Sequence, residues 1–231
     1  MLPRILEPEV MDTPEEALDY DAMDHSEVNR IFVNDCLSSM QKAGLWAEDM
    51  LNRFEQLTVL DVGTGTAQIP IELSRRSISC KITAIDYSAE MLKVAARNVA
   101  DAGLEHNIVL ERIDAKTLPY ENAYFDVVIS NSIVHHIPEP VHVLREMIRV
   151  LSNGGVLFVR DLLRPADRET LDQLVAAYAG DANQRQQQMF RDSLNAALTL
   201  SEIRQLINEL DKPVAWVVQT TNRHWTMNGC L

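Results

Sequence analysis

Cysteine is scarce in this sequence of 231 residues, which contains only Cys36, Cys80 and Cys230. The three are far apart and none belongs to a CxxC pair, so they indicate neither a disulfide framework nor a structural zinc site. Binding of a soft element such as arsenic would need a cluster of thiols, which these positions do not provide. We therefore expect a reducing compartment and no metal site.

Long apolar runs and basic residues are also lacking. No apolar run approaches the roughly 18 residues of a membrane span, and no basic start precedes an apolar signal segment. The 21 Lys and Arg residues are outnumbered by 34 Asp and Glu, which gives a net charge of -13. A nucleic-acid backbone would be repelled by this charge. The sequence predicts a cytoplasmic protein without membrane or nucleic-acid partners, and it leaves the oligomeric state open.

Short runs rich in Val and Ile alternate with helical segments after residue 57. This alternation is typical of strand-helix units that form a parallel sheet covered on both faces. The last two runs are separated by too few residues for a helical crossover, so they are expected to pair antiparallel. The pattern predicts an α/β, Rossmann-like, mostly parallel sheet of seven strands whose last strand is antiparallel. Expected strands are 58–62, 82–86, 108–113, 125–130, 156–161, 214–219 and 223–227, and expected helices are 68–75, 90–102 and 140–151.

The remaining segments differ from this alternating pattern. Residues 1–25 are acidic and punctuated by proline, which indicates an irregular arm rather than a core element. Apolar residues recur at helical spacing within 26–56, and a longer helical region at 167–210 interrupts the strand-helix order. We expect a single domain at 26–231, with helical cap elements at 26–56 and 167–210, the second of which is inserted before the final hairpin.

The most informative stretch is VLDVGTGTAQIP, at residues 59–70. A strand that runs into a turn with Gly63 and Gly65 lets a ligand approach backbone N–H groups closely. The dinucleotide fingerprint GxGxxG would require a third glycine where Gln68 stands, which weakens a nicotinamide-binding interpretation. Asp61, two residues before the turn, would repel a pyrophosphate but attract an ammonium group.

Acidic residues also end the next two expected strands. Asp86 ends the second strand, where a carboxylate can accept hydrogen bonds from both ribose hydroxyls of an adenosine. Asp114 and Ala115 follow the third strand in ERIDAKTLPY, and the fourth strand continues into FDVVISNSIVHHIPEP. Asp86 supports adenosine binding in general, because nicotinamide enzymes share this feature.

These segments, in this order, resemble the class I S-adenosylmethionine-dependent methyltransferases over residues 57–163 and again in the last two strands. The run from Asp61 to Gly65 is similar to their motif I, which usually has a third glycine where Ala67 stands. The resemblance implies S-adenosylmethionine as cofactor, in-line methyl transfer, a small-molecule acceptor and an acidic contact to the adenine amino group. The cofactor contacts that it implies are Asp61, Gly63, Thr64, Gly65, Asp86, Tyr87, Met91, Asp114, Ala115 and Ser130.

Two histidines follow the fourth expected strand, at the end of the sheet where ligands bind in open parallel sheets. An imidazole there could take a proton from an acceptor. SNSIVHHI resembles the corresponding segment of phosphoethanolamine methyltransferases, whose catalytic histidine falls on His136 and is paired with an amino-terminal tyrosine. The resemblance makes His136 the first catalytic candidate, with His135 and Tyr20 as further ones. Alternatively, the histidines cap or pack the loop and Tyr20 anchors the arm.

Two other functions stay open at this stage. One is a non-catalytic protein that binds S-adenosylmethionine or S-adenosylhomocysteine, because only the histidines argue for turnover. The other is an NAD(P)-dependent oxidoreductase, which Asp61 and Gln68 disfavour. The segment at residues 131–134 has no NPPY-like tetrapeptide, which disfavours methylation of amides or exocyclic amines. The acceptor and its reacting atom are not determined by the sequence.

Overall fold

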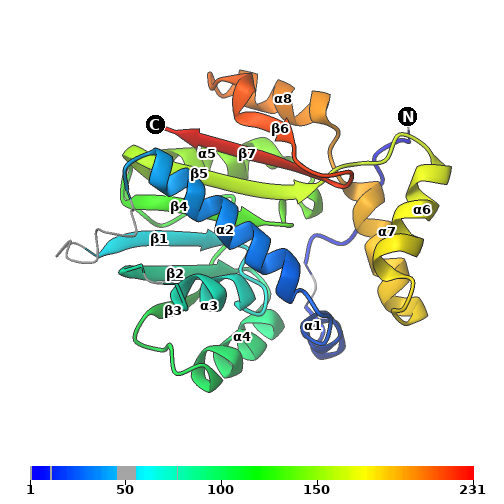
Figure 1. Ribbon diagram of the computed structural model, residues 1–231, viewed down its shortest axis with the longest axis horizontal. Helices are drawn as coiled ribbons and strands as arrows, with labels where there is room; N and C mark the ends of the chain where they lie inside the picture. Colours follow the sequence, from blue (N-terminus) through cyan, green and yellow to red (C-terminus); the bar gives the residue numbers. More distant parts are fainter. Residues whose placement is uncertain (1, 11, 46–55, 77) are drawn as a thin grey trace. The chain divides into compact units, whose positions relative to one another are not determined.

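The computed structural model describes residues 2–10, 12–45, 56–76 and 78–231, and within these residues seven strands form one sheet. Their order across the sheet is β3-β2-β1-β4-β5-β7-β6 (Figure 1). The strands are β1 (Leu57–Val62), β2 (Cys80–Asp86), β3 (Ile108–Arg112), β4 (Phe125–Asn131), β5 (Leu151–Leu162), β6 (Val217–Gln219) and β7 (His224–Cys230).

The pairing of the strands agrees with the expected topology. β1 pairs in parallel with both β2 and β4, and β2 pairs in parallel with β3. β6 and β7 pair antiparallel, with Val217 opposite Met227. The predicted α/β sheet, mostly parallel with an antiparallel last strand, is confirmed. After β1 the chain adds β2 and β3 on one side of the sheet, and it then adds β4 on the other side of β1. Ligands of such sheets bind outside the carboxyl ends of the strands, at the point where the strand order changes side.

Helices and short 3-10 turns connect the strands. Three of the helices between β1 and β5 agree to within one residue at each end with the predicted helical segments at 68–75, 90–102 and 140–151. The elements are α1 (Pro14–Asp21), α2 (Ser26–Lys42), α3 (Gln68–Ser74), α4 (Ala89–Asp101), η1 (Val134–His136), α5 (Pro140–Val150), α6 (Arg168–Ala179), α7 (Gln184–Ala196), α8 (Leu200–Glu209) and η2 (Val214–Trp216).

The amino-terminal segment differs from its prediction as an irregular arm. Residues Pro14–Asp21 form helix α1, which begins with a capping box between Thr13 and Glu16. Pro14 stands in the first turn, where proline needs no hydrogen-bond partner for its nitrogen. The prediction was wrong because it took the proline as a break, although T-P-E-E is a helix-start signal.

The predicted helical regions are divided into shorter helices. Within 26–56, α2 ends at Lys42, and the part of the prediction that falls on 46–55 lies outside the described residues. The region 167–210 contains α6, α7 and α8. Each begins at a polar cap, Asp167, Asn183 or Thr199, whose side chain accepts a hydrogen bond from the backbone three residues later.

Contacts divide the chain into two compact units. The first unit comprises Met1–Val10, Ser132–Val141 and Arg160–Met227, and the second comprises Met11–Asn131, His142–Val159 and Asn228–Leu231. In the second unit, α2 packs on the sheet, with the ring of Phe32 edge-on to Phe158 at 5.1 Å between centroids. In the first unit, Leu171 of α6 and Leu194 of α7 share a core. The expected division into an arm and one domain stays a prediction.

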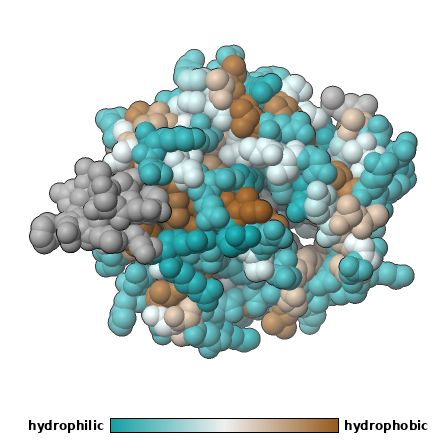
Figure 2. Space-filling model, in the orientation of Figure 1, coloured by the Kyte–Doolittle hydropathy of each residue, from teal (hydrophilic) through white to brown (hydrophobic). Residues whose placement is uncertain are grey.

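The surface is mainly polar on the face drawn in Figure 2, where hydrophobic residues occur in small separate groups. Among the described residues, no helix combines the length and the apolar character needed to cross a membrane.

Candidate functional site

The glycine turn lies between β1 and α3, in the second unit. Gly63 and Gly65 have positive φ angles of 74° and 55°, which side-chain-bearing residues rarely adopt. The N–H groups of Gly63 and Thr64 both donate to the carbonyl of Ile85, at 2.9 Å, which fastens the turn to β2. Ala67 also has a positive φ, 62°, and stands where motif I usually has its third glycine. The backbone at this position therefore has the conformation that favours glycine.

Two buried carboxylates flank this turn. Asp86, at the end of β2, accepts hydrogen bonds from the N–H groups of Gly65 at 2.8 Å and Ser88 at 2.9 Å. Burial raises the pKa of Asp86, although these hydrogen bonds act in the opposite direction. Asp61 is only 2% exposed, and burial raises its pKa to about 7, with a further contribution from the charge of Asp86. For both carboxyl groups, burial disfavours the ionised form more than the surrounding hydrogen bonds favour it.

A small cavity of about 20 Å³ opens beside Asp61. The described residues that line it are Tyr20, Asn29, Asp61, Gly63, Thr64, Thr66, Gln68, Ile69 and Asn131, and none of these is basic. Tyr20 of α1 reaches the turn, and a Cβ added to Gly65 would lie 3.6 Å from its ring. Burial and the charges of Asp86 and Asp61 raise the pKa of Tyr20 to about 12. The tyrosine hydroxyl therefore keeps its proton at neutral pH and can donate a hydrogen bond.

Polar side chains fasten α1 over this cavity. Asp12, before α1, accepts a hydrogen bond from the Ser88 hydroxyl at 3.0 Å. At the end of α1, Asp21 accepts hydrogen bonds from the side-chain amides of Gln68 at 3.2 Å and Asn98 at 2.9 Å. Gln68, which replaces a glycine of the dinucleotide fingerprint, thus connects α3 to α1.

Met91 and Ser130, two further predicted cofactor contacts, are not among the residues that line the cavity. Met91 is buried beside Tyr20 in a small cluster with Ala17 and Val94. Ser130 is fully buried and donates its hydroxyl proton to the carbonyl of Val62 at 2.8 Å. Ser130 therefore joins β4 to β1, and the next residue on β4, Asn131, lines the cavity instead.

Tyr87, Asp114 and Ala115 do not line the cavity. Tyr87 is 49% exposed. The carboxylate of Asp114 accepts a hydrogen bond from the backbone N–H of Lys116 at 2.9 Å and pairs with its ammonium group at 3.2 Å. The cofactor contacts implied for these three residues stay predictions.

The two histidines lie on the 3-10 turn η1 in the first unit, with their ring centroids 4.2 Å apart. Asp161, near the end of β5, accepts hydrogen bonds from the N–H of Val134 at 2.6 Å and from Nδ1 of His135 at 2.6 Å. The same carboxylate accepts a 2.6 Å hydrogen bond from the N–H of Leu162. A single buried aspartate thus holds both the turn and the ring of His135.

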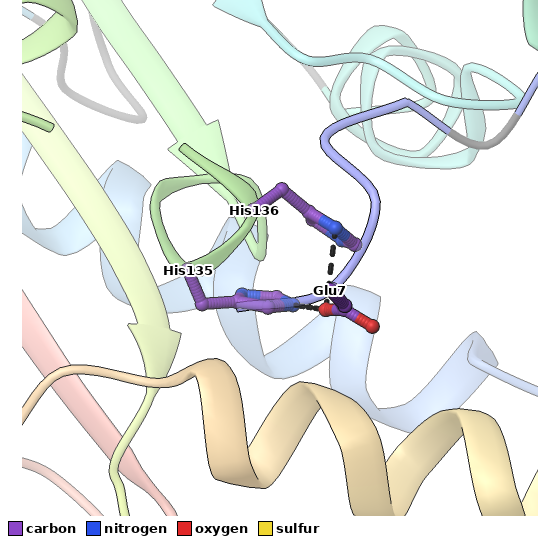
Figure 3. Close-up of side chains that lie close together, drawn as sticks. All are labelled: Glu7, His135 and His136. Carbon is purple, nitrogen blue, oxygen red and sulfur yellow. Dashed lines mark ion pairs between the residues drawn. The ribbon is translucent and has the colours of Figure 1, made fainter. Parts of the chain in front are cut away.

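Glu7, from the amino-terminal segment, faces both histidines (Figure 3). Its Oε1 lies 3.4 Å from Nε2 of His135 and 3.2 Å from Nδ1 of His136. Arg4 fixes this segment, because its guanidinium donates to the backbone carbonyls of His135 at 3.1 Å and Ile137 at 3.0 Å. The hydroxyl of Ser193 donates to the Glu7 carboxylate at 3.1 Å.

The pKa values of four ionisable side chains around η1 are shifted in different directions. These side chains are Glu7, His135, His136 and Asp161. Burial opposes the charged form of His135, but Asp161 and Glu7 outweigh it and raise the pKa of this histidine. Burial and the neighbouring His135 lower the pKa of His136 to about 3. Burial raises the pKa of Glu7, whereas His135 and the hydrogen bonds described above lower the pKa of Asp161 despite its burial. The catalytic role expected of His136 stays a prediction.

A family model described as a methyltransferase domain matches residues 53–218, which is most of the chain. The chain belongs to this methyltransferase family. The matched segment includes β1 to β5, the beginning of β6, the glycine turn and both histidines. The family predicted from the sequence is therefore confirmed.

Individual relatives match only about half of this methyltransferase-family chain. It is 34% identical over 117 residues to a demethylmenaquinone methyltransferase of Porphyromonas gingivalis, covering 50% of this chain and 48% of the relative. It is 38% identical over 101 residues to a phosphatidylethanolamine N-methyltransferase of Cereibacter sphaeroides, covering 44% and 48%. The chain thus spans about half the length of these relatives.

Among solved structures, the fold is similar to that of a SAM-dependent methyltransferase from Aquifex aeolicus. The TM-score is 0.65 at 21% sequence identity, with 94% of this chain and 97% of the other covered. This likeness confirms the Rossmann-like fold of the methyltransferase-family chain.

Sequence reasoning missed several residues of both sites in this methyltransferase-family chain. Glu7 and Arg4 lie in a segment without periodicity, so nothing local indicated that they would meet the histidines. Asn29 was missed because it is a single polar position on an amphipathic helix. Asp161 offered a signal, since it follows a Val-rich run at the end of an expected strand, as Asp61 and Asp86 do.

Proposed function

We propose that this chain binds S-adenosylmethionine and transfers its methyl group to a small-molecule acceptor. The observation that carries the proposal is Asp61, a buried carboxylate at a glycine turn whose pKa is raised and whose cavity has no basic lining among the described residues. A ligand with a cationic ammonium group would supply the missing charge. Membership of the methyltransferase family supports S-adenosylmethionine as that ligand.

The donor would be held by the turn and the two carboxylates beside it. Gly63 and Gly65 allow the donor to approach the backbone, and Asp86 would accept hydrogen bonds from the ribose hydroxyls. We assign Tyr20 to this donor side, because it lies against Gly65 and its raised pKa keeps the hydroxyl as a hydrogen-bond donor. This assignment differs from the catalytic role that the sequence suggested for Tyr20.

The size of the cavity has a consequence for donor entry. A cofactor pocket usually has a volume of roughly 300–1,000 Å³, whereas the cavity beside Asp61 measures about 20 Å³. Tyr20 lies against Gly65 of the turn, and hydrogen bonds to Asp21 hold α1 beside the cavity. We therefore infer that α1 moves when the donor enters.

Methyl transfer from a sulfonium is an in-line displacement with a neutral leaving group, so alignment of the acceptor supplies much of the acceleration. The carbon–sulfur bond breaks as the acceptor bonds to the methyl carbon, and the bonding electron pair stays on sulfur. We place His135 and His136 on the acceptor side, because they follow the carboxyl end of β4, and open parallel sheets bind their ligands at the carboxyl ends of the strands. The relatives named above act on different acceptors, so the acceptor class is left to experiment.

Calorimetric titration with S-adenosylmethionine, S-adenosylhomocysteine and NAD⁺ tests the donor assignment. We expect saturable binding of the first two and none of NAD⁺. Binding of NAD⁺ alone would overturn the proposal. Incubation of metabolite extracts with methyl-labelled donor then tests turnover. A labelled product that depends on the chain supports an enzyme, whereas donor binding without any labelled product would favour a non-catalytic binding protein.

A further inference from the structure

Three potential metal-ligating atoms meet in the first unit, one each from Glu7, His135 and His136. All three lie within 4.8 Å of one another. The carboxylate oxygen of Glu7 is 3.4 Å from Nε2 of His135 and 3.2 Å from Nδ1 of His136. Ligands bound tetrahedrally to one zinc ion at about 2.1 Å are separated by about 3.4 Å. The two separations from Glu7 therefore match edges of a metal coordination polyhedron, and the third pair of atoms lies within 4.8 Å.

Hydrogen bonds leave one of these three atoms unsatisfied. The 3.4 Å contact from His135 to Glu7 exceeds the usual range of about 2.7–3.2 Å for an N–H···O hydrogen bond. Among the described residues, Nδ1 of His136 is buried and has no hydrogen-bond partner. A buried polar atom without a partner is rare and costly. A cation between the three side chains would satisfy this nitrogen.

Neighbouring residues orient the side chains of His135 and Glu7 through hydrogen bonds. The ligands of metal sites are usually oriented by such outer partners. Asp161 binds Nδ1 of His135 at 2.6 Å, which leaves Nε2 as the nitrogen that faces Glu7. Metal-binding histidines commonly donate their other ring N–H to a carboxylate in this way. Ser193 holds the Glu7 carboxylate through its hydroxyl. The side chains of the cluster are 3–17% exposed, so a bound ion would be shielded while a small ligand could still reach it.

We propose that Glu7, His135 and His136 bind a divalent transition-metal ion of the zinc type, with Asp161 as the outer partner of His135. Two imidazole nitrogens and one carboxylate suit Zn²⁺ better than Mg²⁺ or Ca²⁺, which prefer oxygen ligands. Three protein ligands leave a coordination position open, as in zinc sites that act on ligands. This position suits a small molecule with an oxygen donor.

This site replaces two expectations drawn from the sequence. No metal site was expected there, because that prediction rested on the spacing of the cysteines. The sequence also does not indicate that Glu7 lies beside His135 and His136, which are distant from it in the chain. A histidine nitrogen that coordinates a cation is also not available to take a proton from an acceptor. In this proposal His136 is a metal ligand instead of a free base.

Metal binding by the full chain tests the proposal without reference to activity. The protein is freed of metal with a chelator, dialysed, and titrated with ZnCl₂ and separately with MgCl₂. We expect one equivalent of Zn²⁺ per chain and no comparable binding of Mg²⁺. Glu7→Gln and His136→Ala should each weaken Zn²⁺ binding by more than about tenfold, and Asp161→Asn by about 10–100-fold. The exposed His106 provides a matched control, since His106→Ala should leave Zn²⁺ binding unchanged.

The proposal is overturned if Zn²⁺ does not bind saturably, or if folded Glu7→Gln and His136→Ala bind it as the parent does. Circular dichroism establishes whether each variant is folded. For variants that do not fold, anomalous diffraction from parent crystals soaked in Zn²⁺ decides: a peak at about 2.1 Å from the three ligand atoms supports the site, and a peak elsewhere refutes it. S-adenosylhomocysteine binding by Glu7→Gln should persist, so failure of the metal site and failure of the donor assignment are distinguishable.

Discussion

Asp61 and Asp161 are both almost fully buried, with 2% and 1% of their surfaces exposed, yet their pKa values move in opposite directions. Burial raises the pKa of Asp61 to about 7, and the nearby charge of Asp86 adds to this effect. Burial acts on Asp161 as well, but His135 and the N–H of Leu162 outweigh it and lower the pKa. Each aspartate lies near the carboxyl end of a strand of the same sheet.

The difference separates a structural carboxylate from one suited to a ligand. Asp161 already has its hydrogen-bond donors and a cationic partner, so its charge stabilises the fold around η1. Asp61 is buried without a cation among the described residues that line its cavity, which is costly unless the group stays protonated or a ligand brings a positive charge. Burial alone therefore does not identify a functional aspartate, whereas the lack of a cationic partner in the cavity lining does.

The largest effect is expected from Asp161→Ala. Removing this carboxylate leaves His135 buried without its partner and removes the acceptor for the N–H groups of Val134 and Leu162. We expect the free energy of unfolding to fall by about 3–5 kcal/mol, measured by urea denaturation. Asp114→Ala, at a more exposed ion pair, should change it by less than about 1 kcal/mol. Equal effects of the two variants would contradict the structural role of Asp161.

A smaller but still large effect is expected on the donor side from Asp86→Ala. We expect the affinity for S-adenosylhomocysteine to fall by about 100-fold, because hydrogen bonds to a charged group contribute roughly 1.5–3 kcal/mol. Calorimetry measures this affinity, with urea denaturation to separate binding from stability. Glu105→Ala, at an exposed carboxylate before β3, serves as comparison and should leave the affinity unchanged. A parental affinity in folded Asp86→Ala would mean that the ribose is bound elsewhere.

Much of the fold was predictable because the pattern of strands and helices is local. Val- and Ile-rich runs marked the strands, and the short spacing of the last two runs predicted their antiparallel pairing. Helix α1 was missed because its start signal is also local but was read as a break at Pro14. The boundaries of α6, α7 and α8 depend on single caps, such as Asn183, within a continuous helical pattern.

The two sites differ in how far the sequence predicted them. The turn at Gly63 and Gly65 and the carboxylates Asp61 and Asp86 follow strand ends, and a parallel sheet brings strand ends together. The partners of the histidines come from distant segments, and Glu7 reaches them through the hydrogen bonds of Arg4. Such long-range contacts have no periodic signature in a single sequence.

A change of pH is expected to alter the donor affinity less than Asp86→Ala does. The reason for the dependence on pH is that a cationic ligand binds the ionised form of Asp61. The raised pKa means that the empty site holds a proton below pH 7, and this proton must leave when the ammonium group binds. The affinity for S-adenosylhomocysteine should therefore fall by about tenfold from pH 8 to pH 6, measured by calorimetry. In Asp61→Asn the affinity should be lower and should vary much less with pH.

The raised pKa of Asp61 also predicts how the stability of the unliganded chain depends on pH. Between the unfolded pKa near 4 and the folded pKa of about 7, the folded state holds a proton that the unfolded state has lost. The contribution of Asp61 to stability therefore falls as the pH rises through this window. Asp61→Asn should remove this fall. Identical pH profiles of stability for the parent and Asp61→Asn would contradict the environment assigned to Asp61.

The smallest effect concerns α1, which covers the cavity beside Asp61. Thr13→Ala removes the capping box at its start and should destabilise the helix by about 1 kcal/mol. If α1 opens when the donor enters, the rates of donor association and dissociation should both rise by about fivefold while the affinity changes little. Stopped-flow fluorescence would measure these rates. The same capping box begins α8 at Thr199, away from the cavity lining, so Thr199→Ala should weaken a helix without changing either rate. Equal donor kinetics in both variants would mean that α1 is a fixed wall of the cavity.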